Sequence, residues 1–282
     1  MGLIPFQTGY LMRKYIFVLL LYLFFVPVLN AQEKPKESYF GLGLGLQSRT
    51  FKDQLVTQST YQGTSFFVSL QHQKIKGNTL RYFEFEGSIG SVKTDEFDRD
   101  QAGGKFQAPS VSSFWNEIEF RHLFLLSERP KGSWFLGPAA YHLLHLRIGP
   151  RWDNSQLNYE IGGGLKAEGA YRRPVRVMKK DALLQVGLQV PLVGYILRPS
   201  YSGVPDFLDI NKDFLVDMFE NNYVTWMGNF PRIQTSFRLD LPIASGNRMQ
   251  AGYDWQFYSF QEPWTTQAAV HTFSLNFFLR AK

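Results

Sequence analysis

About ten segments of this chain alternate apolar and polar residues with a period of two, whereas continuous apolar sequence is confined to the N-terminal region. In the segment 157–171, Leu157 and Tyr159 occupy odd positions, while Asn158 and Glu160 occupy even ones. Successive side chains of a strand point to opposite faces, so such a segment has one apolar and one polar face. Long, aromatic-rich strands of this kind are typical of a membrane-spanning β-barrel, whose outside contacts lipid and whose interior contacts water.

The apolar N-terminal stretch has the features of a secretory signal peptide. Arg13 and Lys14 precede the apolar run 15–28, and Ala31 supplies a small residue at a cleavage site. A single membrane anchor is the alternative interpretation. The run is shorter than the roughly 18–20 residues that a spanning helix needs, which favours the signal peptide. We expect one domain behind a cleaved signal, divided as follows: signal peptide 1–31, with 1–11 an over-extended start; periplasmic leader 32–37; outer-membrane β-barrel 38–282.

The composition argues against several classes of protein. The sequence contains no cysteine, so we expect neither a disulfide nor a lipoprotein anchor nor a thiolate metal site. The formal net charge is +6, but the densest basic group, 172–180, lies between two alternating segments and resembles a charged turn. We therefore expect no nucleic-acid partner. Aromatic residues make up 16% of the chain although its mean hydropathy is −0.20, a combination that suits a barrel with aromatic girdles.

The lengths of the connections give the orientation of the predicted barrel. The two longest connections, 94–110 and 198–231, are both odd-numbered, and three of the four even-numbered ones are short. Outer-membrane barrels place short turns in the periplasm and longer loops outside, so both termini are expected in the periplasm. The fold class is thus all-β, a transmembrane antiparallel up-and-down barrel of about ten strands, predicted over 39–46, 61–74, 79–93, 111–126, 134–148, 157–171, 182–197, 232–241, 248–260 and 270–280.

The end of the signal, Leu29-Asn-Ala-Gln32, the aromatic-rich strands and the alternating last strand resemble small outer-membrane β-barrel proteins of the Bacteroidota type. The resemblance is architectural and covers most of the chain. It departs at the C-terminus, because such proteins usually end on an aromatic residue whereas this chain carries Arg280-Ala-Lys282. The resemblance implies location in the cell outer membrane. The implied partners are outer-membrane lipid and lipopolysaccharide, the barrel-assembly machinery and other outer-membrane proteins.

The inward faces of the predicted strands carry both acids and bases. A barrel of about ten strands is nearly filled by side chains, and a charge inside it needs a partner. We therefore expect a salt-bridged network that plugs the lumen, formed by Glu84, Glu86, Glu117, Glu119, Arg121, Glu160, Lys166, Glu168, Arg238, Asp240 and Asp254. A selective pore and acid–base work by paired carboxylates are the alternatives for these residues.

The histidines offer no predicted site. His142 and His145 lie three positions apart on one strand, so they face opposite sides and cannot jointly bind a metal there. We recognise no arrangement of a histidine with a serine nucleophile, and we predict no catalytic residue, metal or cofactor. Enzyme activity nevertheless stays open, because such sites assemble from distant loops and leave weak local patterns.

The long connection 198–231 is the candidate partner or plug loop. Its segment 205–220 could form a short amphipathic helix, and its alternating acids lack the glycine and glutamate of a calcium loop. The candidate residues are Asp206, Phe207, Asp209, Phe214, Met218, Phe219 and Trp226. We expect a structural, binding or assembly role with a charge-plugged lumen. The alternatives are an outer-membrane hydrolase or lipid A modifying enzyme and, third, a narrow passive pore.

Overall fold

The structure is a computed structural model that describes residues 37–55, 58–95, 97–98, 105–106, 110–149, 157–198 and 222–281. The expected signal peptide and the helix expected over 205–220 lie outside these ranges. Among the described residues, no helix is long and apolar enough to cross a membrane.

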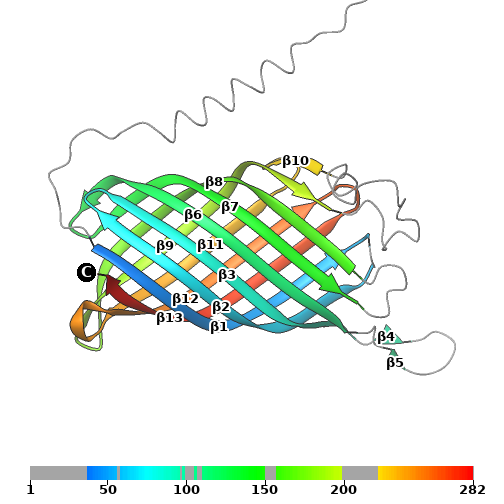
Figure 1. Ribbon diagram of the computed structural model, residues 1–282, viewed down its shortest axis with the longest axis horizontal. Helices are drawn as coiled ribbons and strands as arrows, with labels where there is room; N and C mark the ends of the chain where they lie inside the picture. Colours follow the sequence, from blue (N-terminus) through cyan, green and yellow to red (C-terminus); the bar gives the residue numbers. More distant parts are fainter. Residues whose placement is uncertain are drawn as a thin grey trace, which may run out of the picture. The chain divides into compact units, whose positions relative to one another are not determined.

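Antiparallel strands close into a barrel (Figure 1). The sheet runs in the order β10-β9-β11-β12-β13-β1-β2-β3-β6-β7-β8, and pairing of β8 with β9 closes it. Because β10 and β11 both pair with β9, one after the other, the eleven strands occupy ten positions around the barrel. The expected fold class is confirmed. The strands are β1 (Glu37–Asp53), β2 (Thr60–Lys76), β3 (Thr79–Thr94), β6 (Val111–Arg129), β7 (Gly132–Ile148), β8 (Leu157–Val177), β9 (Lys180–Leu197), β10 (Asn222–Trp226), β11 (Arg232–Pro242), β12 (Arg248–Phe260) and β13 (Thr266–Ala281), with a separate small pair, β4 (Phe97–Asp98) and β5 (Lys105–Phe106).

The two ends of the barrel differ in their connections. At one end, two-residue turns follow β2, β6 and β8, and a short segment containing the 3-10 helix η2 (Ala244–Gly246) follows β11. The expected connections 127–133 and 172–181 were too long, because the strands continue to the turns at 130–131 and 178–179. Met178 and Lys179 both have positive φ, as the tight type I′ hairpin turn requires. We call this the short-turn end and the opposite one the loop end; both described chain ends lie at the short-turn end, where Ser38 pairs with Ala281.

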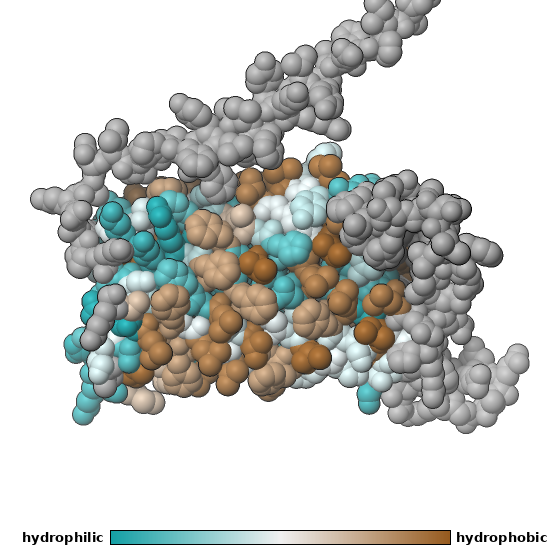
Figure 2. Space-filling view, viewed as in Figure 1, coloured by the Kyte–Doolittle hydropathy of each residue, from teal (hydrophilic) through white to brown (hydrophobic). Residues whose placement is uncertain are grey.

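The outward and inward faces are as the alternation predicts. Along β1, Leu42, Leu44 and Leu46 are half exposed on the outside, while Gly41 and Gly43 face inward. Apolar residues cover much of the visible barrel face, and hydrophilic ones gather at the end that carries the C-terminus (Figure 2). An apolar outside around a polar interior is the arrangement of a membrane-spanning barrel.

The sequence prediction also missed strand at the loop end, of which two stretches matter for the interior and the expected plug loop. β1 continues from Leu46 to Asp53, because beyond Leu46 its outward face turns polar and the apolar alternation ends although the pairing does not. β10 lies inside the expected connection 198–231, and it pairs with Val193–Leu197 of β9. Trp226 therefore belongs to the barrel wall, with its side chain 57% exposed. The other candidate residues of the plug loop lie outside the described residues.

Candidate functional site in the barrel interior

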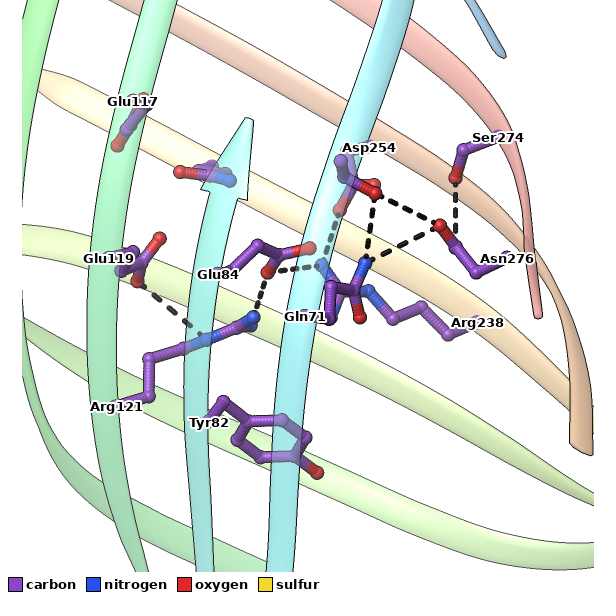
Figure 3. Close-up of polar contacts among 12 residues, drawn as sticks. Gln71, Tyr82, Glu84, Glu117, Glu119, Arg121, Arg238, Asp254, Ser274 and Asn276 are labelled. Atoms are coloured by element: carbon purple, nitrogen blue, oxygen red, sulfur yellow. Dashed lines mark hydrogen bonds and ion pairs between the residues drawn. The ribbon is translucent and has the colours of Figure 1, made fainter. Parts of the chain in front are cut away.

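Side chains from opposite walls meet at three levels of the interior, which we call the middle, loop-end and short-turn layers. The middle layer is centred on Glu84 of β3 and Arg121 of β6, which form an ion pair (Figure 3). Arg238 reaches across the lumen from β11. Its Nη2 lies 3.4 Å from Glu84 Oε2 and 3.5 Å from Asp254 Oδ1. Arg121 also lies 3.8 Å from Glu168 on β8. Glu84, Arg121 and Arg238 thus bridge the barrel between β3 and β11.

A second group of the middle layer surrounds Glu117 of β6. Arg232, from β11, donates hydrogen bonds of 2.5 and 2.7 Å from Nη2 to the two carboxylate oxygens of Glu117. Lys166 Nζ lies 2.9 Å from Glu117 Oε1 and 3.5 Å from Glu119 Oε2. Gln189 joins Glu119 to Glu168 through its amide nitrogen at 2.7 and 3.0 Å. All of these side chains are buried, so the charges are shielded from bulk water.

The loop-end layer contains three arginines and two acids among its described residues. Arg147 Nη2 lies 2.9 Å from Asp53 Oδ2 and 3.0 Å from Glu160 Oε1. Arg198, directly after β9, lies 2.9 Å from Asp53 and 3.6 Å from Glu160. The third arginine, Arg49, has no carboxylate within ion-pair distance among the described residues. It is nevertheless fully buried.

Aromatic rings fill the space between these arginines. The guanidinium of Arg49 lies 4.9 Å from the centre of the Trp115 ring, and that of Arg147 lies 5.2 Å from the Phe51 ring. Cations over aromatic faces are favourable, and more so when both are desolvated. The sequence prediction did not include this inward apolar cluster. It comprises Phe51, Tyr61, Val92, Val111, Trp115, Tyr141, Leu143, Ile196, Phe230, Tyr258, Phe260 and Ala268.

The short-turn layer holds a smaller polar group. Arg248 pairs with Asp240 at 3.3 Å and donates a 2.8 Å hydrogen bond to Gln73 of β2. Its guanidinium lies 3.9 Å from the centre of the Tyr39 ring. Gln250 donates to the second oxygen of Asp240 at 2.7 Å, so this acid is also fully partnered.

The structure places the eleven expected network residues on the inward face but not in one cluster. Asp240 lies in the short-turn layer and Glu160 in the loop-end layer. The remaining nine belong to the middle layer, where Glu86, opposite Glu117, and Asp254 are partly exposed. Partners that the prediction left out are the buried Arg49, Asp53, Arg147, Arg198 and Arg232, and the partly exposed Arg248. The sequence does contain a signal for Arg232, because it lies an even number of residues before Arg238 and therefore on the same inward face of β11.

The sequence reveals no arrangement of a histidine with a serine nucleophile, but the structure brings such residues together. Partly buried Ser38 lies 2.9 Å from His72 Nε2 through its hydroxyl oxygen, and a second contact lies in the interior. His142 faces outward and His145 inward, as predicted, but Ser113 Oγ lies 3.1 Å from His145 Nε2. On the other side of the ring, Nδ1 lies 3.5 Å from Glu160 Oε2. The residues come from β6, β7 and β8, and the pairing between these strands is not visible in the sequence.

No group of three or more His, Cys, Asp or Glu side chains among the described residues could hold a metal ion. The charges of the interior are instead paired mainly with one another.

Comparison with known proteins adds little to this geometry. No protein-family model and no curated protein matches the chain. Among solved structures it is similar to a TodX deltaS2S3 mutant, a monoaromatic hydrocarbon channel, with 7% identity and a TM-score of 0.31 over 87% of this chain and 91% of that one. It is also similar to Pseudomonas aeruginosa OpdL, with 8% identity and a TM-score of 0.20 over 88% and 99% of the chains. Scores at this level assign neither a family nor a ligand.

The fold and the interior together define the class of protein: a membrane-spanning antiparallel β-barrel whose lumen is crossed by paired side chains.

Proposed function

We propose that the chain is an outer-membrane β-barrel with a closed lumen and a structural, binding or assembly role. The observation that carries this proposal is that contacts cross the lumen in every layer. They join β11 to β3 and β6 in the middle, β12 to β8 at the loop end, and β12 to β2 at the short-turn end. A solute that moves along the axis would have to break each of these contacts in turn.

The energetics favour a lumen that stays closed. Taking a charge out of water costs several kcal/mol, which only well-placed partners offset, so an ion pair broken inside a narrow barrel is strongly unfavourable. Water that entered with a solute would lessen this cost. At the loop end the arginines are also packed among aromatic rings, so a solute would have to displace these rings as well. We infer that the structural or binding role proposed here is carried by the outer surface and the loops.

Location and partners are part of the same proposal. An apolar outside on a barrel supports placement in the outer membrane, with contacts to its lipid and lipopolysaccharide. Insertion by the barrel-assembly machinery, association with other outer-membrane proteins and membership of the Bacteroidota type of small barrel extend the proposal from the resemblance of the sequence.

Conductance measurements test the closed lumen. Purified protein in planar lipid bilayers is expected to show no steady conductance, because the three layers lie in series along the axis. Folding and insertion are checked on the same preparation by the shift in electrophoretic mobility that boiling causes in folded barrels. A large, ion-selective conductance of the unmodified protein would refute the proposal.

A narrow passive pore is the second candidate, and one observation favours it. Arg147 Nη1, Arg232 Nη1 and Arg238 Nη1 are buried and have no hydrogen-bond partner among the described residues. Buried polar atoms in proteins are almost always hydrogen-bonded, so bound water is the natural partner here. Water that was continuous through all three layers would make a pore, and the same recordings decide between the two functions.

Orientation is open to a labelling test, because the chain contains no cysteine of its own. Gln261→Cys adds a thiol at the loop end, and Met178→Cys adds one at a short turn, where the native side chain is 93% exposed. If the loops face outward, a membrane-impermeant maleimide should label Gln261→Cys on intact cells and Met178→Cys only after the outer membrane is permeabilised. The reverse pattern would invert the proposed topology.

A further inference from the structure

We propose that Ser113, His145 and Glu160, together with Arg49, form an acyl-transfer site for esters of apolar acyl groups. This activity goes beyond the structural or binding role proposed above and does not depend on it. The four residues lie in the loop-end layer, where each is 1% exposed or less.

The strand pairing holds the site in place. His145 on β7 lies directly opposite Glu160 on β8, and on its other side it lies opposite Trp115 on β6. Ser113 comes two residues before Trp115 on the same face, so it reaches His145 diagonally, within the range of side chains on neighbouring strands. Three adjacent strands of a closed barrel thus position a hydroxyl, an imidazole and a carboxylate in that order.

The hydrogen bonds select the ring tautomer that a general base needs. Arg49 Nη1 can only donate, and it lies 3.3 Å from His145 Nε2, so this nitrogen is an acceptor. The ring proton therefore lies on Nδ1, which faces Glu160 Oε2 at 3.5 Å but makes no hydrogen bond among the described residues. Ser113 Oγ, 3.1 Å from Nε2, shares this acceptor with Arg49, so the hydroxyl proton reaches Nε2 when Arg49 turns to the substrate. A nucleophile, a base and a third group that orients the base are the parts of an activated serine.

Arg49 supplies the positive charge that acyl transfer requires. Its Nη1 donates a 2.5 Å hydrogen bond to Ser113 Oγ, so the guanidinium lies beside the atom that would attack. Its Nε is buried and has no hydrogen-bond partner among the described residues. Donors placed where negative charge develops stabilise the transition state. The Arg49 charge is available for this purpose because no described carboxylate pairs with it.

The surroundings indicate the kind of substrate. The Trp115 ring lies 5.1 Å from the His145 ring, and the Phe51 ring lies 6.1 Å from it and edge-on. Both rings belong to the apolar cluster of the loop end. A site lined in this way suits an acyl group of hydrocarbon character, whose burial is favourable, rather than a charged one.

The reaction balances with an ester and water alone. Ser113 Oγ attacks the ester carbonyl carbon while its proton moves to His145 Nε2. The alcohol then leaves with that proton, and the acyl group stays bonded to Oγ. Water, deprotonated by His145, attacks the acyl carbon, and the acid leaves as Ser113 regains its proton. Glu160 acts as a positioning residue, because its negative charge lies 3.5 Å from Nδ1 and favours the ring proton on that nitrogen.

The experiment uses the full chain purified in detergent and a fluorescent alkyl fluorophosphonate, which phosphonylates activated serines. Ser113 is buried in this structure, so a smaller organophosphate is tested in parallel and should react faster. Ser113→Ala is the key variant, and Ser69→Ala is its matched control. Ser69 is an equally buried, inward-facing serine at the level of the middle layer, opposite Glu86, and it is bonded to Asn276 instead of a histidine. The boiling-dependent mobility shift confirms that each variant is folded.

We expect labelling of the wild type and of Ser69→Ala, mapped to Ser113 by peptide mass, and complete loss in Ser113→Ala. His145→Asn should slow labelling by roughly 10²–10⁴-fold, the usual contribution of a general base. Glu160→Gln should lower the labelling rate, and Glu160→Asp, which restores a carboxylate, should recover part of it. A purely structural role of Glu160 would leave the labelling rate of folded protein unchanged.

The source of the ester is separated by two substrates. Release of p-nitrophenol from acyl esters of increasing chain length reports a soluble ester, and release of fatty acid from phospholipid vesicles that hold the protein reports a membrane lipid. Activity in either assay that disappears in Ser113→Ala supports the proposal and identifies the source. Failure of both organophosphates to label Ser113 in folded wild-type protein, or equal labelling of Ser113→Ala, would overturn it.

Discussion

Replacement of Glu117 by alanine is expected to lower the free energy of unfolding of the barrel by about 3–5 kcal/mol. Glu117 is 3% exposed, and its carboxylate is the partner of both Arg232 and Lys166. After its removal Lys166 still reaches Glu119, but Arg232 loses its only described carboxylate partner. A buried cation without a partner costs far more than the pair itself contributes, which is why the loss should be large.

The measurement is a urea unfolding curve of the refolded protein in lipid vesicles, followed by tryptophan fluorescence. Glu37→Ala is the matched control, because it also removes a glutamate that pairs with an arginine. The Glu37–Arg280 pair is 3.5 Å long, but its side chains are 35% and 47% exposed, so its loss should cost about 0–1 kcal/mol. Equal small effects of the two variants would show that water already reaches the middle layer.

Much of the barrel follows from the sequence because period-two alternation acts locally. Leu44 and its neighbours predict an outward face for β1, and Glu84 or Lys166 predict an inward one, without knowledge of which strands pair. The prediction failed where the two faces cease to differ in polarity. In β1 beyond Leu46, for example, polar residues face outward while Phe51 faces inward.

The Ser113 site could not be predicted in the same way. Its members lie on three strands, and a shift of one residue in either pairing would send one of them to the lipid side. The register that brings His145 opposite Trp115 depends on the two-residue turn after β6 and on the irregularity of pairing between Leu125 and Ser127, and the pairing of β7 with β8 brings it opposite Glu160. Neither is encoded by the alternation. Arg49 was missed for a related reason, because its strand was expected to end before it.

Arg147 and Arg49, two fully buried arginines of the same layer, are expected to respond very differently to replacement by methionine. Methionine preserves most of the apolar stem in both cases and removes the charge. Arg147→Met takes a partner from both Asp53 and Glu160, which then retain Arg198, and should cost about 3–5 kcal/mol of unfolding free energy. Arg49→Met leaves no described carboxylate without a partner.

The groups that Arg49 contacts are also partnered without it. Gln47 keeps its bonds to Thr272 and Ser88, and Ser113 keeps His145. We therefore expect Arg49→Met to cost less than about 1 kcal/mol, or to stabilise the barrel, because a buried charge without an acid is itself a cost. Unfolding curves of the two variants against the wild type measure the difference.

Active sites are commonly not optimal for stability. A role in the reaction would therefore explain why Arg49 is buried at a position where its charge lowers the stability of the barrel. On that argument Arg49→Met should keep the fold and its stability while it slows fluorophosphonate labelling of Ser113. A loss of stability as large as that of Arg147→Met would instead make Arg49 a structural member of the charge network. In that case the guanidinium beside Ser113 would be explained by packing alone.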